Sequence, residues 1–277
     1  MSNKELILLG TTRWIQSPML PEVKKVLSDI NTSESYINRG SGEATSKLKD
    51  LIKRHRNWIS PIIDVSDFPY AYITNGVTDA INLWKLIDKR PWQIRSGDYS
   101  WPAMIDPSNP PVDDDNAVLY VSNPSAINGN VIDLDNITAP VILDCTYIGA
   151  INDHHTITVP PNTEQVMFGF SKGWGVIGQR LGIVYTKHKH PILHPLQMVE
   201  CWNYLSVDIM DQIIKSFPIN YPHYNYSNIQ NTLCDKLDLK ASDTYFIGLT
   251  DDAKVKHMRR AGKEARLCLT PLIQRDI

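Results

Sequence analysis

The chain has 277 residues and a formal net charge of −2, from 28 Lys and Arg residues against 30 Asp and Glu. The hydrophobic fraction of 42% is typical of a globular protein, and it argues against a disordered, collagen-like or coiled-coil chain. A charge so near zero also argues against a nucleic-acid partner, because such proteins carry a strongly basic surface. At about 150 residues per domain, the length favours two domains, or one large α/β unit with a smaller lobe.

No apolar run approaches the roughly 18 residues that cross a bilayer, and the run from Leu6 to Leu9 is too short for a signal-peptide core. The four cysteines are widely spaced and form no Cys-x-x-Cys pair: Cys145, Cys201, Cys234 and Cys268. This usage is typical of reduced thiols in a reducing compartment. We therefore expect a soluble cytoplasmic protein without a membrane partner.

In chain order, short apolar runs that end in turn or polar residues predict buried strands. They cover residues 68–74, 117–121, 140–143, 165–170 and 181–185. Helices are predicted at 46–58, which is amphipathic, and at 78–86, which follows a glycine turn. Strands that alternate with helices indicate an α/β fold with a parallel, doubly wound sheet. Ligands bind such sheets outside the carboxyl ends of the strands.

The pattern changes after about residue 200. It predicts a helix at 198–217, a loop rich in Tyr, Asn and Pro at 218–231, strands at 245–249 and 265–269, and a basic helix near 251–262. These elements indicate a small α+β lobe. We expect a large domain over residues 40–200, and a small domain made of residues 1–39 and 201–277.

Two predicted strand ends carry polar groups that could bind a ligand: one could bind an anion, and the other offers a carboxylate to a positively charged group. Gly76 stands at a strand-to-helix turn, where free backbone N–H groups and the Thr78 hydroxyl would suit a phosphate. Asp144 and Tyr147 follow another strand and offer a carboxylate and a phenol. Each group has an ordinary structural alternative: a capped turn, a capping Asp and a packed Tyr.

A third strand end carries the sequence Ser171-Lys172-Gly173. An ammonium group at a buried strand end is costly to desolvate, and a Schiff base would remove that cost. Arg180, eight residues later, could bind a phosphate. A phosphate site, a carboxylate, a lysine and an arginine together are what pyridoxal phosphate requires.

The motifs resemble those of the fold-type I, class I/II aminotransferases, which use pyridoxal phosphate, and they follow in the same order. Residues 76–80 resemble the phosphate-binding turn, and residues 170–182 resemble the Ser-Lys…Gly-x-Arg-x-Gly signature. Asp98-Tyr-Ser-Trp-Pro102 resembles the segment whose aromatic ring stacks on the cofactor, with Trp101 the best match and Tyr99 the reserve. Asn123-Pro124 with Asn128-Gly129 resembles the Asn-Pro…Gly motif, and Ala265-Arg-Leu-Cys-Leu269 the strand that carries the substrate-binding arginine.

The resemblance implies a large domain with a mostly parallel sheet flanked by helices, a reduced small α+β domain, and a homodimer. It implies an aminotransferase that moves an amino group between an amino acid and a 2-oxo acid through a Schiff base on Lys172. Asp144 would hold the pyridine nitrogen, Asn123 and Tyr147 the ring hydroxyl, and Arg266 the substrate carboxylate. The phosphate would be held by Gly76, Val77, Thr78, Ser171 and Arg180, and by Tyr36 of the neighbouring subunit. Gly10 would lie over the substrate, and Arg13 is a further candidate for the substrate pocket.

The chain also departs from the family pattern. The span from Lys172 to Arg266 is short for the family, and Gly169 replaces a second phosphate-binding serine. Two alternatives stay open. Similar strand-end motifs occur in carbon–sulfur lyases of this fold, so a lyase or decarboxylase is the first, and a non-catalytic homologue, suggested by the shortened C-terminal part, is the second. We expect no metal site, because the spacing of His188, His190 and His194 suits a solvated loop better than zinc.

Overall fold

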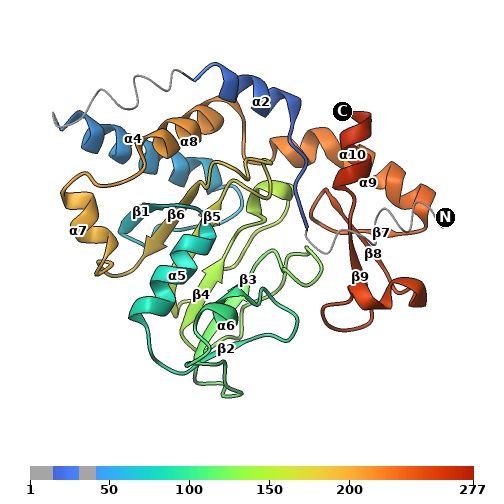
Figure 1. Ribbon diagram of the computed structural model, residues 1–277, viewed down its shortest axis with the longest axis horizontal. Coiled ribbons are helices and arrows are strands. Elements are labelled where there is room, and N and C mark those ends of the chain that lie inside the picture. Colours follow the sequence, from blue (N-terminus) through green and yellow to red (C-terminus); the bar gives the residue numbers. More distant parts are fainter. Residues whose placement is uncertain (1–14, 31–41) are drawn as a thin grey trace.

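A computed structural model of the chain describes residues 15–30 and 42–277. Its main element is a six-stranded sheet with the strand order β1-β6-β5-β4-β3-β2 (Figure 1). The strands are β1 (Tyr70–Thr74), β2 (Trp92–Ile94), β3 (Val118–Ser122), β4 (Val141–Asp144), β5 (Thr163–Gly169) and β6 (Gly182–Thr186). β6 runs antiparallel to both of its neighbours, and the other five strands run parallel to one another. The predicted α/β fold with a mostly parallel sheet is confirmed.

Both faces of the sheet are buried, which explains why its strands read as nearly continuous apolar runs. In β3, Leu119 and Val121 belong to one core cluster, while Val118 and Tyr120 belong to the other. Successive side chains of a strand point to opposite faces, so each strand must be apolar on both. Two layers of helices cover these faces.

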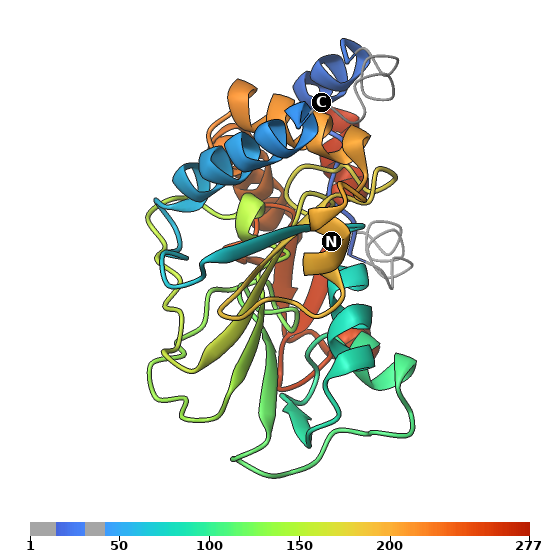
Figure 2. The ribbon, with the colours of Figure 1, turned by 90° about the vertical axis from the view of Figure 1, so that its left-hand side faces the viewer.

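The first core cluster lies under α4 (Glu43–Ile59) and α8 (Tyr204–Ser216), which pack against each other (Figures 1 and 2). An ion pair joins them, because Arg54 Nε donates to Asp211 Oδ1 at 2.7 Å. The second cluster lies under α5 (Val77–Ile87), α6 (Trp101–Ile105) and α7 (Leu193–Met198). The shorter elements are α2 (Pro21–Ser28), α10 (Thr270–Asp276) and the 3₁₀ turns η1 (Ile148–Ala150) and η2 (Ala253–Met258). Among the described helices, none is both long and apolar enough to cross a membrane.

A second, antiparallel sheet holds β7 (Lys240–Ala241), β8 (Ile247–Thr250) and β9 (Ala265–Cys268), and it lies beside the large sheet (Figure 1). The two strands predicted in this part of the chain are confirmed. The basic helix predicted near 251–262 is present only as η2. The division of the chain into domains at residue 200 stays a prediction, since α8 packs on α4 while β7 to β9 form their own sheet.

The loop predicted at 218–231 is wrong, because helix α9 (Tyr221–Leu237) occupies most of it. Pro222 lies in the first turn, where a missing backbone N–H costs nothing. The buried side chains recur at helical spacing, at Tyr226, Gln230, Leu233 and Leu237. Exposed Asn and Tyr residues between them conceal this stripe in the sequence.

Candidate active site

One cavity lies where the parallel strands end at their carboxyl termini. Its lining includes four residues predicted for the catalytic centre, namely Asp144, Tyr147, Lys172 and Arg266. It also includes four predicted for the phosphate: Val77, Thr78, Ser171 and Arg180. The structure thus brings together groups that are far apart in the sequence, as the carboxyl edge of a parallel sheet does.

The reversed direction of β6 explains how Arg180 reaches this edge. The chain leaves β5 at Gly169, passes through Ser171 and Lys172, and returns into β6 at Gly182. Gly182 pairs with Gly169 on one side and with Thr74 on the other. An antiparallel strand begins where its neighbours end, so the residues just before β6 lie at the carboxyl ends of β1 and β5.

The amino end of α5 forms the phosphate side of the cavity. Val77 and Thr78 are its first residues, and N–H groups at these positions have no acceptor within the helix. Gly76 precedes them with φ 81° and ψ 172°, a conformation that favours glycine. A Cβ atom on Gly76 would lie 3.0 Å from Nη2 of Arg180, so this guanidinium rests directly on the turn.

Gly169, where a second phosphate-binding serine was expected, lies behind α5 instead of offering a ligand. A Cβ atom there would lie 3.2 Å from Cγ2 of Val77, which is tighter than an ordinary contact. The absence of a side chain therefore lets the first turn of α5 approach the end of β5.

Lys172 is a partly buried amine that lines the cavity. Burial lowers its pKa from the ordinary value of 10.5 to about 8, and the positive charges of Arg266 and Arg180 act in the same direction. The amine donates a hydrogen bond to the backbone carbonyl of Ile15. Residues 15–20, which we call the N-terminal strap, thus bound the cavity at the lysine, and Ile15 is one of its lining residues.

Asp144 is a buried carboxylate whose two oxygens are held by donors. Its Oδ2 accepts the Tyr120 hydroxyl at 2.6 Å, and its Oδ1 accepts the backbone N–H of Thr146 at 2.9 Å as well as the Thr146 hydroxyl. Burial nevertheless raises the pKa of Asp144 above its usual range. No ion pair joins it to a cationic side chain of the described residues, so a cationic ligand would find a fixed, unneutralised partner here.

Arg266 reaches the cavity from β9 of the small sheet. Its Nη1 donates to the backbone carbonyl of Ala126, and the side chain is buried. Burial raises the pKa of the Tyr147 phenol, and the charge of Arg266, which lines the same cavity, opposes that rise. An arginine held in this way is suited to a carboxylate.

Tyr99, and not Trp101, lies in the cavity. Trp101 begins α6, and its indole Nε1 donates to Oδ1 of Asn82 at 2.9 Å. Asp98 fixes the preceding turn, because its carboxylate accepts the backbone N–H of Tyr99 at 2.7 Å and that of Ser122 at 3.0 Å. Tyr99 follows this turn and lines the cavity, whereas Trp101 does not, so the geometry favours Tyr99 over Trp101 for the predicted stacking role.

Asn123 does not line the cavity either. It is fully buried, its Nδ2 donates to the carbonyl of Ile132 at 3.0 Å, and its Oδ1 accepts the N–H of Ile132 at 3.1 Å. Its neighbour Ser122 lines the cavity instead. The role predicted for Asn123 toward the ring hydroxyl stays a prediction, and its amide already binds the Ile132 backbone through one donor and one acceptor.

The predicted residues Gly10, Arg13 and Tyr36 lie outside the described residues. The sequence reasoning missed Thr146, Ile177 and Arg260, which also line the cavity. Arg260 was part of the basic helix predicted near 251–262, and no signal in the sequence singled it out.

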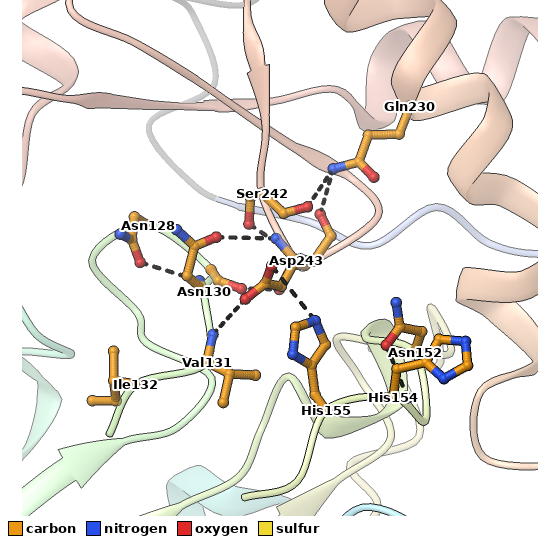
Figure 3. Close-up of polar contacts among 12 residues, drawn as sticks. Asn128, Asn130, Val131, Ile132, Asn152, His154, His155, Gln230, Ser242 and Asp243 are labelled. Carbon is orange, nitrogen blue, oxygen red and sulfur yellow. Dashed lines mark hydrogen bonds and ion pairs between the residues drawn. The ribbon is translucent and has the colours of Figure 1, made fainter. Parts of the chain in front are cut away.

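A polar cluster behind the cavity ties the small sheet to the loops of the large one (Figure 3). Asp243, in the turn between β7 and β8, accepts the N–H of Val131 at 2.9 Å and donates its own N–H to Oδ1 of Asn130 at 3.0 Å. His155 Nε2 lies 3.5 Å from Oδ1 of Asp243. The Gln230 amide binds three carbonyls in or near the same turn. This cluster fixes the sheet that carries Arg266.

Gly129, part of the Asn-Pro…Gly motif, has a packing role in this cluster. Its φ is 81°, and a Cβ atom would lie 2.6 Å from Oγ of Ser242. Any larger residue would push the small sheet away from the loop, which explains a glycine at this place in the motif.

No family model and no curated protein matches the chain. Solved structures do. Histidinol-phosphate aminotransferase from Sinorhizobium meliloti, in complex with pyridoxal-5'-phosphate, matches with a TM-score of 0.63 at 13% identity, over 95% of this chain and 90% of that one. A probable N-succinyldiaminopimelate aminotransferase from Thermus thermophilus matches with 0.66 at 12%, over 98% and 96%. The pyridoxal-phosphate-bound C–S lyase from Staphylococcus hominis matches with 0.64 at 10%, over 95% and 88%.

The chain has the fold of these enzymes. At such identities the likeness concerns the fold alone, and it confirms the expected fold-type I architecture. What the chain binds and which reaction it performs must be argued from its own residues.

Proposed function

We propose that the chain is a pyridoxal-phosphate-dependent aminotransferase that moves an amino group between an amino acid and a 2-oxo acid. The observation that carries the proposal is the placement of Lys172. Its amine, with a pKa lowered to about 8, shares one cavity with the buried carboxylate of Asp144 and the guanidinium groups of Arg180 and Arg266. The fold shared with known aminotransferases supports the same conclusion.

The described residues fit the cofactor group by group. The amino end of α5, with the hydroxyls of Thr78 and Ser171 and the guanidinium of Arg180, would hold the phosphate. Asp144 lacks a cationic partner among the described residues, and a protonated pyridine nitrogen would supply one. Lys172 would hold the aldehyde carbon. When bound, pyridoxal phosphate supplies an aldehyde that reacts with amines and a ring that accepts electrons from the substrate.

The chain's own residues would then perform the proton transfers. An amine with a pKa of about 8 is partly neutral at pH 7, so Lys172 Nζ can take a proton from the substrate Cα and return it. Asp144, fixed by Tyr120 and Thr146, would hold a proton on the ring nitrogen through a charge-assisted hydrogen bond. Arg266 would bind the substrate carboxylate and so orient the Cα–H bond. Tyr99, which lines the cavity, would pack against the ring.

We further propose that the protein is a homodimer in the cytoplasm. The dimer is expected from the resemblance of the segment around Tyr36, and several large apolar side chains are well exposed, among them Met198 (72%) and Val199 (73%) at the end of α7. The cytoplasm suits the free thiols of Cys145, Cys201, Cys234 and Cys268. Light scattering of the purified protein would measure the oligomeric state.

The test is the visible absorption spectrum of the protein with pyridoxal phosphate, recorded before and after each of a panel of amino acids is added without an oxo acid. An aminotransferase shows a visible band that its donor bleaches as pyridoxamine phosphate forms. A band that persists while pyruvate or carbon dioxide accumulates indicates a lyase or a decarboxylase. No band in excess cofactor indicates a non-catalytic protein.

Lys172→Ala and Lys256→Gln make a matched pair for this experiment. Lys256 is an exposed lysine of η2 and lies outside the cavity lining. We expect the visible band to vanish in Lys172→Ala and to remain in Lys256→Gln. Full turnover by Lys172→Ala would refute the proposal.

A further inference from the structure

Tyr120 is a buried residue that reaches the candidate site through Asp144. It lies in β3, belongs to the second core cluster and does not line the cavity itself. Its hydroxyl donates to Oδ2 of Asp144 at 2.6 Å. Burial and the charge of Asp144 raise the pKa of Tyr120 well above its usual value, so the phenol keeps its proton and is the donor of this hydrogen bond.

The core holds the Tyr120 ring in a fixed position. The side chain is fully buried, and its ring stacks on the indole of Trp84, with the two ring centroids 6.0 Å apart and an interplanar angle of 14°. Trp84 lies in α5, the helix whose amino end forms the phosphate side of the cavity. The indole of Trp92 packs edge-on against Trp84 at 5.7 Å. The phenol is therefore a rigid donor, because close packing holds core side chains in their rotamers.

The hydrogen bonds of Asp144 leave one acceptor position for a ligand. An ionised carboxylate has about four acceptor positions, two on each oxygen. Thr146 fills both positions of Oδ1, with its backbone N–H at 2.9 Å and with its hydroxyl. Tyr120 fills one position of Oδ2, and none of the other described residues donates to this oxygen. The open position is therefore on the oxygen that Tyr120 binds, and Asp144 is a lining residue of the cavity.

The donors around Asp144 decide whether this buried carboxyl group is ionised. Burial raises the pKa of Asp144, the charge of Asp98 acts in the same direction, and the hydrogen bonds from Thr146 and Tyr120 oppose the rise. Only the ionised form can accept a hydrogen bond from a protonated ring nitrogen. A protonated Asp144 would instead donate to a neutral ring nitrogen, and a neutral ring accepts electrons less readily.

We propose that Tyr120 is a positioning residue that acts through Asp144: its hydroxyl keeps the carboxylate ionised, so that the shared proton lies on the ring nitrogen of the cofactor and not on Asp144. The inference rests on the proposed function for the identity of the ring as that of pyridoxal phosphate. The competing role is packing alone, in which the Tyr120 hydroxyl only satisfies its own hydrogen bond. In that case, its removal would lower stability without moving the proton.

The first test needs no cofactor. The infrared band of the protonated Asp144 carboxyl group, identified by its loss in Asp144→Asn, would be followed against pH in the ligand-free full chain. Tyr120→Phe removes only the hydroxyl, and we expect it to move the midpoint of this titration to higher pH. An unchanged or lower midpoint would overturn the proposal. The other titratable groups that interact with Asp144 are present in both chains: Asp98, Tyr99, Cys145 and Tyr147.

Tyr72→Phe is the matched control, because it removes a tyrosine hydroxyl from the same core cluster far from Asp144. Tyr72 lies in β1, which β6 and β5 separate from β4, and its hydroxyl accepts the backbone N–H of His190 at 3.2 Å. The midpoint should stay at the wild-type value in this variant. An equal shift in Tyr72→Phe and Tyr120→Phe would assign the effect to the packing of the cluster and overturn the proposal.

A second variant covers the case in which Tyr120→Phe does not fold. Fluorotyrosine placed at position 120 keeps the ring and has a more acidic phenol, which is a stronger hydrogen-bond donor. The midpoint of the Asp144 titration should then move to lower pH, and an unchanged midpoint would overturn the proposal.

The second test locates the proton in a complex. Pyridoxine phosphate has the ring and the phosphate of the cofactor but no aldehyde, so it cannot react with Lys172. With an isotopic label at the ring nitrogen, its nitrogen NMR shift distinguishes a protonated ring from a neutral one. We expect a protonated ring in the wild type and in Tyr72→Phe. In Tyr120→Phe, the ratio of protonated to neutral ring should fall about 10- to 100-fold, as the loss of a hydrogen bond to a charged group predicts.

The two tests separate this inference from the proposed function. If the wild type binds neither pyridoxine phosphate nor pyridoxal phosphate, but Tyr120→Phe still raises the midpoint of Asp144, the proposed function fails and the action of Tyr120 on the carboxylate stands. If the chain binds the ring but the position of the proton does not depend on Tyr120, only the positioning role fails.

Discussion

The lowered pKa of Lys172 leads to a prediction that needs no cofactor and no substrate. With a pKa of about 8 instead of 10.5, the fraction of neutral amine at pH 7 rises from about 0.03% to about 9%, which is roughly 300-fold. Only the neutral amine attacks an electrophile. Lys172 should therefore react faster at pH 7 than an equally buried lysine with the ordinary pKa. In urea, the pKa should return to the ordinary value.

Arg266→Gln is the perturbation, because it removes a positive charge that disfavours the ammonium form of Lys172. The pKa of the lysine should rise in this variant but stay below 10.5, since burial is the larger cause and remains. Competitive labelling with trace acetic anhydride between about pH 6 and pH 11.5, followed by mass spectrometry of the Lys172 peptide, measures the midpoint. A midpoint near 10.5 in the folded wild type, or a fall in Arg266→Gln, would refute the reasoning.

Three further predictions concern stability and cofactor binding. Burial lowers the pKa of His55 from 6.5 to about 3, so between these pH values the unfolded chain binds more protons and stability falls as the pH falls. In His55→Gln, the decline of the free energy of unfolding between pH 7 and pH 5 should be smaller by up to about 1.4 kcal/mol per pH unit. Urea unfolding at the two pH values measures this slope, and an unchanged slope would contradict the prediction. Gly76→Ala should lower the free energy of unfolding by about 1–3 kcal/mol in the same assay and weaken pyridoxal phosphate binding, because the new methyl group would contact the guanidinium of Arg180. Gly178→Ala, whose methyl group would face open space, should have neither effect. Tyr99→Ala should shift the absorption maximum of the bound cofactor and Trp101→Ala should not, and the opposite result would restore Trp101 as the stacking residue.

The sequence predicts the core of this fold because hydrophobic runs and their polar ends are local features. Asp144 and Lys172 each follow a buried run directly, and the geometry of parallel strands alone brings such ends together. The strand that follows Arg180, β6, was also predicted, but its direction was not. Whether a run such as 182–186 pairs parallel or antiparallel depends on partners far away in the chain, which no local pattern specifies.

Other features depend on tertiary contacts that override local composition. Helix α9 was missed because only a narrow stripe of its surface is buried, and Gln230 in that stripe is polar. The choice between Tyr99 and Trp101 turned on the carboxylate of Asp98, which fixes the turn by binding backbone groups of two separate segments. Motif spacing restricts the predicted stacking residue to two candidates, and only packing shows which of the two lines the cavity.

The N-terminal strap makes the site depend on both ends of the described chain. Sγ of Cys268 donates to the carbonyl of Gln16 at 3.3 Å, and Ser17 Oγ lies 3.4 Å from the hydroxyl of Tyr245; these contacts span 252 and 228 positions along the chain. During synthesis, the strap leaves the ribosome well before its anchors and Arg266. The entropic free energy of closing so long a loop remains modest, because each doubling of loop length adds only about 0.6 kcal/mol. Lys172 is therefore synthesised long before β9, the strand that anchors the strap. The amine of Lys172 is enclosed by the strap and by Arg266 only after β9 has folded into place.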